Sequence, residues 1–450
     1  MGLPDSSDSV TNPTTTDHPD PADPNGTLAA LIPAGREDIT VEWLEFVLSR
    51  RSGPSTPGKL QFSVTAGAEP GTNYATAVYA VHVTRHADPA DGERKEDERR
   101  LIVKLPHDDP FGRFFCFATR CYEREILFYD RLAPALESAL GRELAVPRYY
   151  HGATDGRGGV VMAMDDLRAL GYRMPAAASR LDEHHVLLVV SALAEVVSAG
   201  LVVQQRGGPP AELLRHPLLN IGSMWAGPRM EVDLIRAGLL GYIGFLRHYP
   251  ERRAAAAKLE TLLDSARELM VEGMHAGGRL RSICHGDLWK LNMMFRYPSE
   301  KDGAPDAVML LDWQHCHFGN FLVDLFSVLV NNTDRQFRRR HTEGVLRHFH
   351  GRLVAALEAA GLNADQLGLG SWERLRDDYR SSMKAALIRV IFDVVLPLAD
   401  ADATSGAPEG ATPQELVDRL VAAMSVRTSD TQLETLLLEL LDEMEEAGVL

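Results

Sequence analysis

Cysteine is scarce in this sequence. Four of the 450 residues are cysteines, namely Cys116, Cys121, Cys284 and Cys316. Four scattered thiols are too few for the disulfide framework of a small secreted domain. A zinc site could be imagined from Cys284, His285 and the His-Cys-His run at 315–317. These residues lack the Cys-x-x-Cys pairing of structural zinc sites, so we expect them to be packing residues instead.

We also expect neither a membrane-spanning segment nor a signal peptide. We expect no run of the sequence to span a membrane, and the first residues do not read as a signal peptide. Residues 1–6 fit the loose N-myristoylation pattern, but no basic residue supports it. The sequence therefore predicts a cytoplasmic protein that does not bind membranes.

Positive charge is nearly absent from the two ends. Residues 1–35 carry five Asp and no Lys or Arg, and residues 402–450 carry eleven acidic and two basic residues. Subtracting these ends, −5 and −9, from the formal net charge of −16 leaves −2 for the rest of the chain. This distribution disfavours nucleic acid and anionic membranes as partners. The basic cluster at 335–341 is expected to be a solvated helix face.

What the sequence does contain is a set of polar residues typical of phosphoryl transfer. His285, Asp287 and Asn292 lie within eight positions, and Asp312 follows Asn292 by twenty positions at the end of an apolar run. Phosphoryl transfer needs one carboxylate that accepts the proton of the attacking hydroxyl. It also needs an amide oxygen and a second carboxylate that bind magnesium. The pattern predicts Asp287 as the general base and Asn292 and Asp312 as Mg²⁺ ligands. We expect His285 and Asp324 to fix the loop between them.

A lysine interrupts the short apolar strand predicted over 101–106. A buried lysine is costly unless a phosphate or a carboxylate receives it. In kinases a strand lysine binds the α- and β-phosphates of ATP and is held by a helix glutamate. We therefore expect Lys104 to bind ATP. Glu125 or Glu123, in a helix predicted over 113–132, can supply the partner, and Glu125 is preferred because its neighbours look inward-facing.

A glycine turn precedes this lysine in the chain. Strands are predicted over 61–68 and 74–84, and the turn between them contains Gly71 and Asn73. Taken alone, such a turn is only a hairpin signal. Its position ahead of Lys104 predicts a loop that covers the ATP phosphates, with Asn73 and backbone N–H groups as donors.

Four segments are predicted along the chain. Residues 1–35 form an acidic segment that cannot bury a core and is expected to be disordered. Residues 36–164 form a nucleotide-binding lobe with a small antiparallel sheet. Residues 165–400 form a larger, mainly helical lobe with the catalytic loop and the substrate pocket. Residues 401–450 form acidic C-terminal helices. The predicted fold class is therefore α+β, with two lobes.

The C-terminal helices show start signals and an apolar stripe. Capping boxes are predicted at Thr412–Glu415 and at Thr431–Glu434. The last helix carries leucines on one side from Leu433 to Leu441. This stripe can pack on its own domain or form a dimer contact, so monomer and homodimer both stay open.

These motifs together resemble the choline kinase/aminoglycoside phosphotransferase superfamily, and within it the ecdysteroid-kinase-like branch. The matching segments are 71–74, 103–105, 124–129, 165–167, 285–295 and 312–314. The resemblance implies a bilobal protein-kinase-like fold and phosphorylation of a small-molecule hydroxyl by ATP and Mg²⁺. The alternatives are an aminoglycoside- or choline-type kinase on the same fold, and a pseudokinase that serves as a binding module.

The substrate is expected to be a small hydroxylated molecule and not a protein. Protein kinases carry a peptide-docking activation loop after the second Asp of the motif. Here Asp324, in an apolar helix, follows Asp312 by only twelve positions. Trp289 also occupies a position at which a bulky indole could form one wall of a compact pocket.

Overall fold

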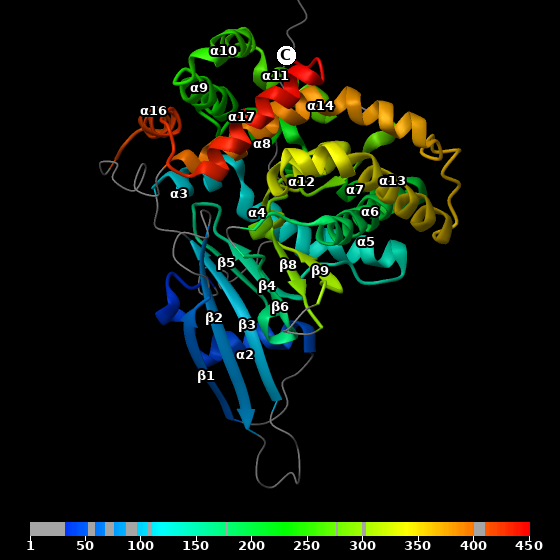
Figure 1. Ribbon diagram of the computed structural model, residues 1–450. Coiled ribbons are helices and arrows are strands. Elements are labelled where there is room, and N and C mark those ends of the chain that lie inside the picture. Colours follow the sequence, from blue (N-terminus) through cyan, green and yellow to red (C-terminus); the bar gives the residue numbers. More distant parts are fainter. Residues whose placement is uncertain are drawn as a thin grey trace, which may run out of the picture.

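The chain folds into a small lobe built on a five-stranded antiparallel sheet and a larger lobe built from helices (Figure 1). The computed structural model describes residues 32–52, 59–67, 76–86, 97–106, 110–176, 179–275, 278–298, 303–399 and 410–450. Both the α+β class and the bilobal arrangement expected from the sequence are confirmed.

The small lobe is a sheet in the order β1-β2-β3-β5-β4. Its strands are β1 (Lys59–Ala66), β2 (Thr76–His86), β3 (Asp97–Pro106), β4 (Tyr149–Thr154) and β5 (Val160–Asp165). Helix α2 (Val41–Ser52) starts where the backbone N–H of Trp43 donates to Oγ1 of Thr40, at 3.2 Å. Its apolar side chains pack on the sheet in a core that includes Val81, Val103 and Leu105. This helix therefore covers one face of the sheet.

The register of β3 turns Lys104 toward the other face. Side chains alternate between the two faces of a strand, so the neighbours of a core residue point the opposite way. Val103 and Leu105 lie in the core under α2, whereas Lys104 pairs with Met162 on β5. Met162 belongs to the core shared with the larger lobe. Lys104 is thus directed toward the junction of the two lobes.

The helix predicted over 113–132 is wrong as a single element. The chain forms α3 (Pro110–Thr119), α4 (Cys121–Leu127), a π-helical turn, η3 (Phe128–Leu132), and α5 (Ala133–Leu140). Arg120, with φ 57°, breaks the first two apart in a left-handed conformation. Such a break leaves little trace in hydrophobic periodicity, because apolar residues lie on both sides of it.

The larger lobe is organised around the long helix α6 (Glu183–Arg206). It packs against α13 (Arg335–Ala359) and α5. By length and composition α6 could cross a membrane, contrary to our expectation from the sequence, but 78% of its most apolar window is buried in the protein. It is therefore the core helix of this lobe. The other helices of the lobe are α7 (Gly208–Leu213), α8 (Ile221–Ala226), α9 (Leu234–Leu246), α10 (Arg253–Glu260), α11 (Ala266–His275), α12 (Leu322–Asn332), α14 (Trp372–Val395), α16 (Pro413–Met424) and α17 (Thr431–Glu446).

Two small sheets in this lobe carry the loops with the predicted catalytic residues. One pairs β7 (Arg281–Cys284) with β10 (His317–Asn320), and the other has the order β6-β8-β9. The strands of the second sheet are β6 (Tyr172–Arg173), β8 (Met293–Arg296) and β9 (Ala307–Leu310). The loop from β7 to β8 and the turn after β9 therefore lie side by side.

The last helix, α17, packs on its own lobe. Leu436, Leu437, Leu440, Leu441 and Met444 are buried in the main core, so the chain itself covers the apolar stripe. The capping box at Thr412 and Glu415 is confirmed. The box at Thr431 is wrong, because Asp430 is the N-cap and accepts from the N–H groups of two following residues. An aspartate one position earlier offers the helix a charged acceptor in place of a hydroxyl.

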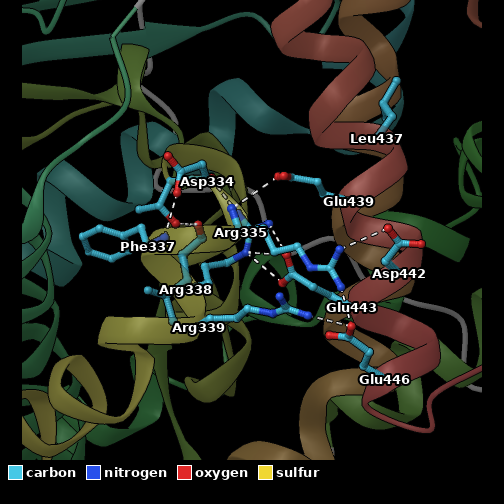
Figure 2. A network of polar contacts seen from close by, with 12 residues as sticks. Asp334, Arg335, Phe337, Arg338, Arg339, Leu437, Glu439, Asp442, Glu443 and Glu446 are labelled. Carbon is cyan, nitrogen blue, oxygen red and sulfur yellow. Dashed lines mark hydrogen bonds and ion pairs between the residues drawn. The ribbon is translucent and has the colours of Figure 1, made fainter.

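The basic cluster at 335–341 is not simply a solvated face, as was expected. Figure 2 shows Arg335, Arg338 and Arg339 of α13 extending toward the acidic side of α17. Nε of Arg338 lies 2.8 Å from Oε2 of Glu443, and Nη2 of Arg339 lies 2.7 Å from Oε1 of Glu446. Arg335 pairs with Asp442 and Glu446. The acidity of the C-terminal segment is thus partly neutralised by its contact with α13.

Replacing Glu443 is expected to destabilise the protein more than replacing Arg339. The side chain of Arg338 is only 5% exposed, so Glu443→Gln leaves a buried guanidinium without its carboxylate and should cost about 2 kcal/mol. The pair of Arg339 with Glu446 is 60% and 52% exposed, so Arg339→Gln should cost less than about 1 kcal/mol. Chemical unfolding of both variants measures this difference, and equal losses would contradict it.

Candidate active site

Lys104 lies between two carboxylates from distant segments. Its Nζ is 2.8 Å from Oε1 of Glu125 on α4 and 2.5 Å from Oδ1 of Asp312, which follows β9. Burial lowers the pKa of Lys104, but the two carboxylates outweigh this effect and raise the pKa overall. The lysine therefore stays cationic at neutral pH.

Glu123, the other candidate partner of this lysine, points elsewhere. Its carboxylate contacts Arg120 at 3.1 Å and Arg229 at 3.4 Å. Glu125 is 1% exposed, whereas the side chain of Glu123 is 16% exposed. The structure thus brings Glu125, and not Glu123, to Lys104.

The loop after β7 is fixed from one side by Asp324. This carboxylate, near the start of α12, accepts from the backbone N–H groups of His285, at 2.6 Å, and Gly286, at 2.9 Å. Gly286 has φ +81°, and a Cβ there would lie 2.5 Å from the carbonyl oxygen of His315. Only glycine fits this turn without strain. Asp324 therefore anchors the loop, which is the position expected for it.

His285 links this loop to the segment that carries Asp312. Its Nδ1 accepts from the backbone N–H of Asp287 at 3.2 Å, and its Nε2 lies 2.8 Å from the carbonyl oxygen of Leu311. Burial lowers the pKa of His285 to about 4, so the ring is neutral and can accept at one nitrogen and donate at the other. Its place in the structure is that of a structural link between the two segments.

Asp287 lies at the tip of the loop and is paired with Asn292. Nδ2 of Asn292 donates to Oδ2 of Asp287 at 2.9 Å and to its carbonyl oxygen at 2.8 Å. Burial raises the pKa of Asp287 to about 8; the nearby carboxylate of Asp393 adds to the increase, and Arg389 opposes it. A carboxylate with this proton affinity suits proton transfer near neutral pH.

Asp312 sits in a strained turn. It has φ 63° and ψ 59°, a left-handed conformation that is uncommon outside glycine. The next residue, Trp313, stacks on Phe128 with ring centroids 3.9 Å apart and an interplanar angle of 4°. This stacking fixes the turn against η3, which directly follows the helix that carries Glu125. Strain of this kind is frequent where a side chain must be aimed at a ligand.

Asn292 and Asp312 fit a magnesium ion by the chemistry of their donors. Residue pairing in the β8–β9 hairpin brings them close, because the N–H of Leu311 donates to the carbonyl oxygen of Asn292 at 2.9 Å. The amide nitrogen of Asn292 is turned to Asp287, which leaves its side-chain oxygen for a cation. Within the described part of the chain, no three His, Cys, Asp or Glu side chains cluster as metal ligands. Two protein oxygens suit Mg²⁺, which keeps several waters and binds phosphates.

The predicted phosphate-covering loop follows β1 in the chain. Gly71 and Asn73 lie outside the residues that the structure describes. The flanking strands are described, and β1 and β2 pair as an antiparallel hairpin from Ala66 and Tyr79 outward. The role of this loop stays a prediction.

Sequence analysis missed a buried ion pair beside the loop. Arg389 and Asp393 lie one turn apart on α14, with side chains 3% and 19% exposed. Nη2 of Arg389 donates to the carbonyl oxygen of Gly286 at 2.8 Å. The signal was present, because both charges interrupt the apolar run from Ala385 to Val395 in the way that Lys104 interrupts its strand. The sequence of this run does not indicate which loop the two side chains face.

Comparison with known proteins gives one family match over most of the chain. Residues 70–362 match the ecdysteroid kinase-like family, and this range contains every predicted site residue. A shorter match links 123 residues to the uncharacterized oxidoreductase dhs-27 of Caenorhabditis elegans, at 27% identity. That match covers 26% of this chain, and the chain spans only 15% of the length of that relative.

Solved structures show more distant likenesses. A spectinomycin phosphotransferase in complex with ADP and spectinomycin is 12% identical, with a TM-score of 0.37, and covers 86% of this chain and 99% of its own. The choline kinase LicA from Streptococcus pneumoniae is 12% identical, with a TM-score of 0.34, and covers 85% of this chain and 98% of its own. At these values neither likeness bears on the activity of this chain.

Proposed function

Because this chain belongs to the ecdysteroid kinase-like family, we propose that it is a kinase that uses ATP and Mg²⁺ to phosphorylate the hydroxyl group of a small molecule. The observation that supports this most directly is the contact of Lys104 with both Glu125 and Asp312. In protein kinases, the strand lysine that binds the ATP phosphates is held by a helix glutamate, and a second carboxylate nearby binds magnesium.

Each residue then has a distinct task. Lys104, oriented by Glu125, binds the phosphates, while Asn292 and Asp312 offer oxygen ligands to Mg²⁺. When bound, ATP would supply the phosphoryl group and leave as ADP, and Mg²⁺ would neutralise part of the negative charge of the phosphates. Asp287 accepts the proton of the acceptor hydroxyl, and Asn292 keeps the base in place through its two hydrogen bonds.

In the same proposal, each lobe binds one of the two substrates. Nucleotide binding belongs to residues 36–164, with Gly71 and Asn73 over the phosphates, and acceptor binding belongs to residues 165–400. The four cysteines are buried and form no disulfide bonds, which fits a cytoplasmic protein. We propose no nucleic acid or membrane partner, because the body of the chain carries little net charge.

A small acceptor is favoured over a protein acceptor by the short path from Asp312 to α12. The residues between them form the short helix η9 (Trp313–His315) and β10, and β10 pairs with β7. Most of their side chains are buried. This path contains no stretch that could dock an extended peptide as an activation loop does.

Labelled ATP and cell extracts test the acceptor class. The protein is incubated with ATP labelled in the γ-phosphate, and either a protein lysate or its small-molecule extract is added separately. We expect label in a compound of the extract, lost with Asp287→Asn and retained with Asp306→Asn, an exposed aspartate paired with Arg296. Asp287-dependent labelling of proteins alone would overturn the small-molecule assignment, and absence of ATP binding would favour a pseudokinase.

A further inference from the structure

The buried pair on α14 contacts the catalytic loop at a different backbone group from Asp324. The guanidinium of Arg389 contacts Asp393, donates to the carbonyl oxygen of Gly286 at 2.8 Å, and lies over the ring of Trp225 with Cζ 5.1 Å from the centroid. The arginine is 2% exposed. A planar guanidinium can make these three contacts at once, whereas the ammonium of a lysine cannot.

Residue Gly286 is therefore fixed at both its N–H and its C=O. The N–H donates to Asp324 of α12 and the C=O accepts from Arg389 of α14. Its backbone is also enclosed, since the nearest atom to an added Cβ would be the carbonyl oxygen of His315 at 2.5 Å. Asp287 is the next residue, so any shift of Gly286 moves the base.

We propose that Arg389 is a positioning residue for Asp287, and that Asp393 orients Arg389 for this task. The inference rests on the proposed kinase function. Arg389 acts through the backbone of Gly286 and through its positive charge, which is close enough to act on both Asp287 and Asp324. Without the arginine, the C=O of Gly286 loses its side-chain hydrogen bond, while Asp324, His285 and Asn292 still contact the loop. The carboxylate of Asp287 then also samples positions that do not reach the acceptor hydroxyl.

A second buried arginine supplies a matched control. Arg338 is also on a long helix, pairs with an acid, Glu443, and donates to a backbone carbonyl, that of Thr333 at 2.5 Å. Its side chain is 5% exposed, compared with 3% for Arg389. The contacts of Arg338 are with α17 and the end of α12 and not with Gly286. A general loss of stability should affect both arginines alike, whereas a positioning role belongs to Arg389 alone.

The test compares Arg389→Lys with Arg338→Lys in the full chain. ADP release from Mg-ATP, with water as the acceptor, gives kcat and KM, and hydrogen exchange of residues 283–292 reports the loop without turnover. We expect Arg389→Lys to lower kcat about tenfold or more with the KM for ATP within about twofold, and to speed exchange in the loop. Arg338→Lys should leave kcat and the exchange of the loop unchanged. Asp393→Asn, which keeps an acceptor for Arg389, should have a smaller effect in the same direction.

Three outcomes would overturn the proposal. Unchanged kcat and loop exchange in Arg389→Lys, beside an active wild type, would remove the positioning role while the kinase function stands. Loss of both Mg-ATP binding and turnover, in Arg389→Lys and in Asp393→Asn, would assign the pair to folding only. If Arg338→Lys changed kcat and loop exchange as much as Arg389→Lys does, the pair would also be assigned to folding only. Failure of the wild type to bind Mg-ATP would instead contradict the proposed function itself.

Discussion

Replacing Asp287 by Asn is expected to lower turnover by roughly 100-fold or more while Mg-ATP binding stays nearly unchanged. The substitution removes the carboxylate that accepts the proton of the acceptor, but it keeps the shape of the side chain. The side-chain oxygen of the new residue can still accept the hydrogen bond from Asn292, which is 2.9 Å long in the wild type. The loop should therefore keep its position.

Turnover is measured with the acceptor recovered from the extract, and affinity for Mg-ATP by calorimetry. Asp306→Asn provides the matched control, since it makes the same chemical change at a pair that is 43–46% exposed. It should leave turnover within about twofold of wild type, as expected for a surface pair. Turnover of Asp287→Asn close to that of the control would remove Asp287 from the role of base.

Replacing Asp312 should remove the dependence of ATP affinity on magnesium. Wild type should bind ATP more tightly with Mg²⁺ than with a chelator, and Asp312→Ala should bind it about equally in both conditions. Asp312 also contacts Lys104 at 2.5 Å, so this variant frees the lysine from one of its two carboxylates. Affinity for adenosine, which lacks phosphates, should not change.

Backbone strain at Asp312 calls for a second variant. Its φ is 63°, and alanine tolerates that conformation less well than asparagine does. Asp312→Asn removes the charge and keeps a residue suited to the turn, so a magnesium effect shared by both variants comes from the lost carboxylate. Magnesium dependence that persists in both Asp312 variants would contradict the role of Asp312 as a ligand.

Lys104→Met should instead weaken ATP binding by roughly 10- to 100-fold and leave the affinity for adenosine unchanged, as expected for lost contacts to charged groups.

The local chemistry of the site was predictable because it depends on short spacings. His285, Asp287 and Asn292 share one loop, and a tight loop between two short strands leaves few ways to arrange residues so close in sequence. Lys104 stood out for a different reason, since one charge in an apolar strand must meet a partner. The predicted capping box at Thr431 was wrong although it is also a local pattern. Asp430 and Thr431 can both cap the helix, and only the backbone geometry decides between them.

The distant contacts were not predictable from local patterns. The neighbouring residues favoured Glu125 over Glu123, but only the packing of α4 shows that Glu125 reaches Lys104. The arginines of α13 looked like a solvated face because their acidic partners on α17 lie about a hundred positions away. The charges of Arg389 and Asp393 interrupt an apolar run, but the sequence does not indicate that they pair or which loop they contact.

The sequence by itself determined the fold class, and it predicted a set of polar residues for the site, because side-chain periodicity and short motifs are local properties of the chain. The tertiary structure decided which carboxylate holds Lys104, how α17 covers the larger lobe, and that Arg389 contacts the loop of Asp287. Those contacts join segments from tens to more than two hundred positions apart. They depend on how whole elements pack, and packing follows from the fit of many side chains at once and not from any one pattern.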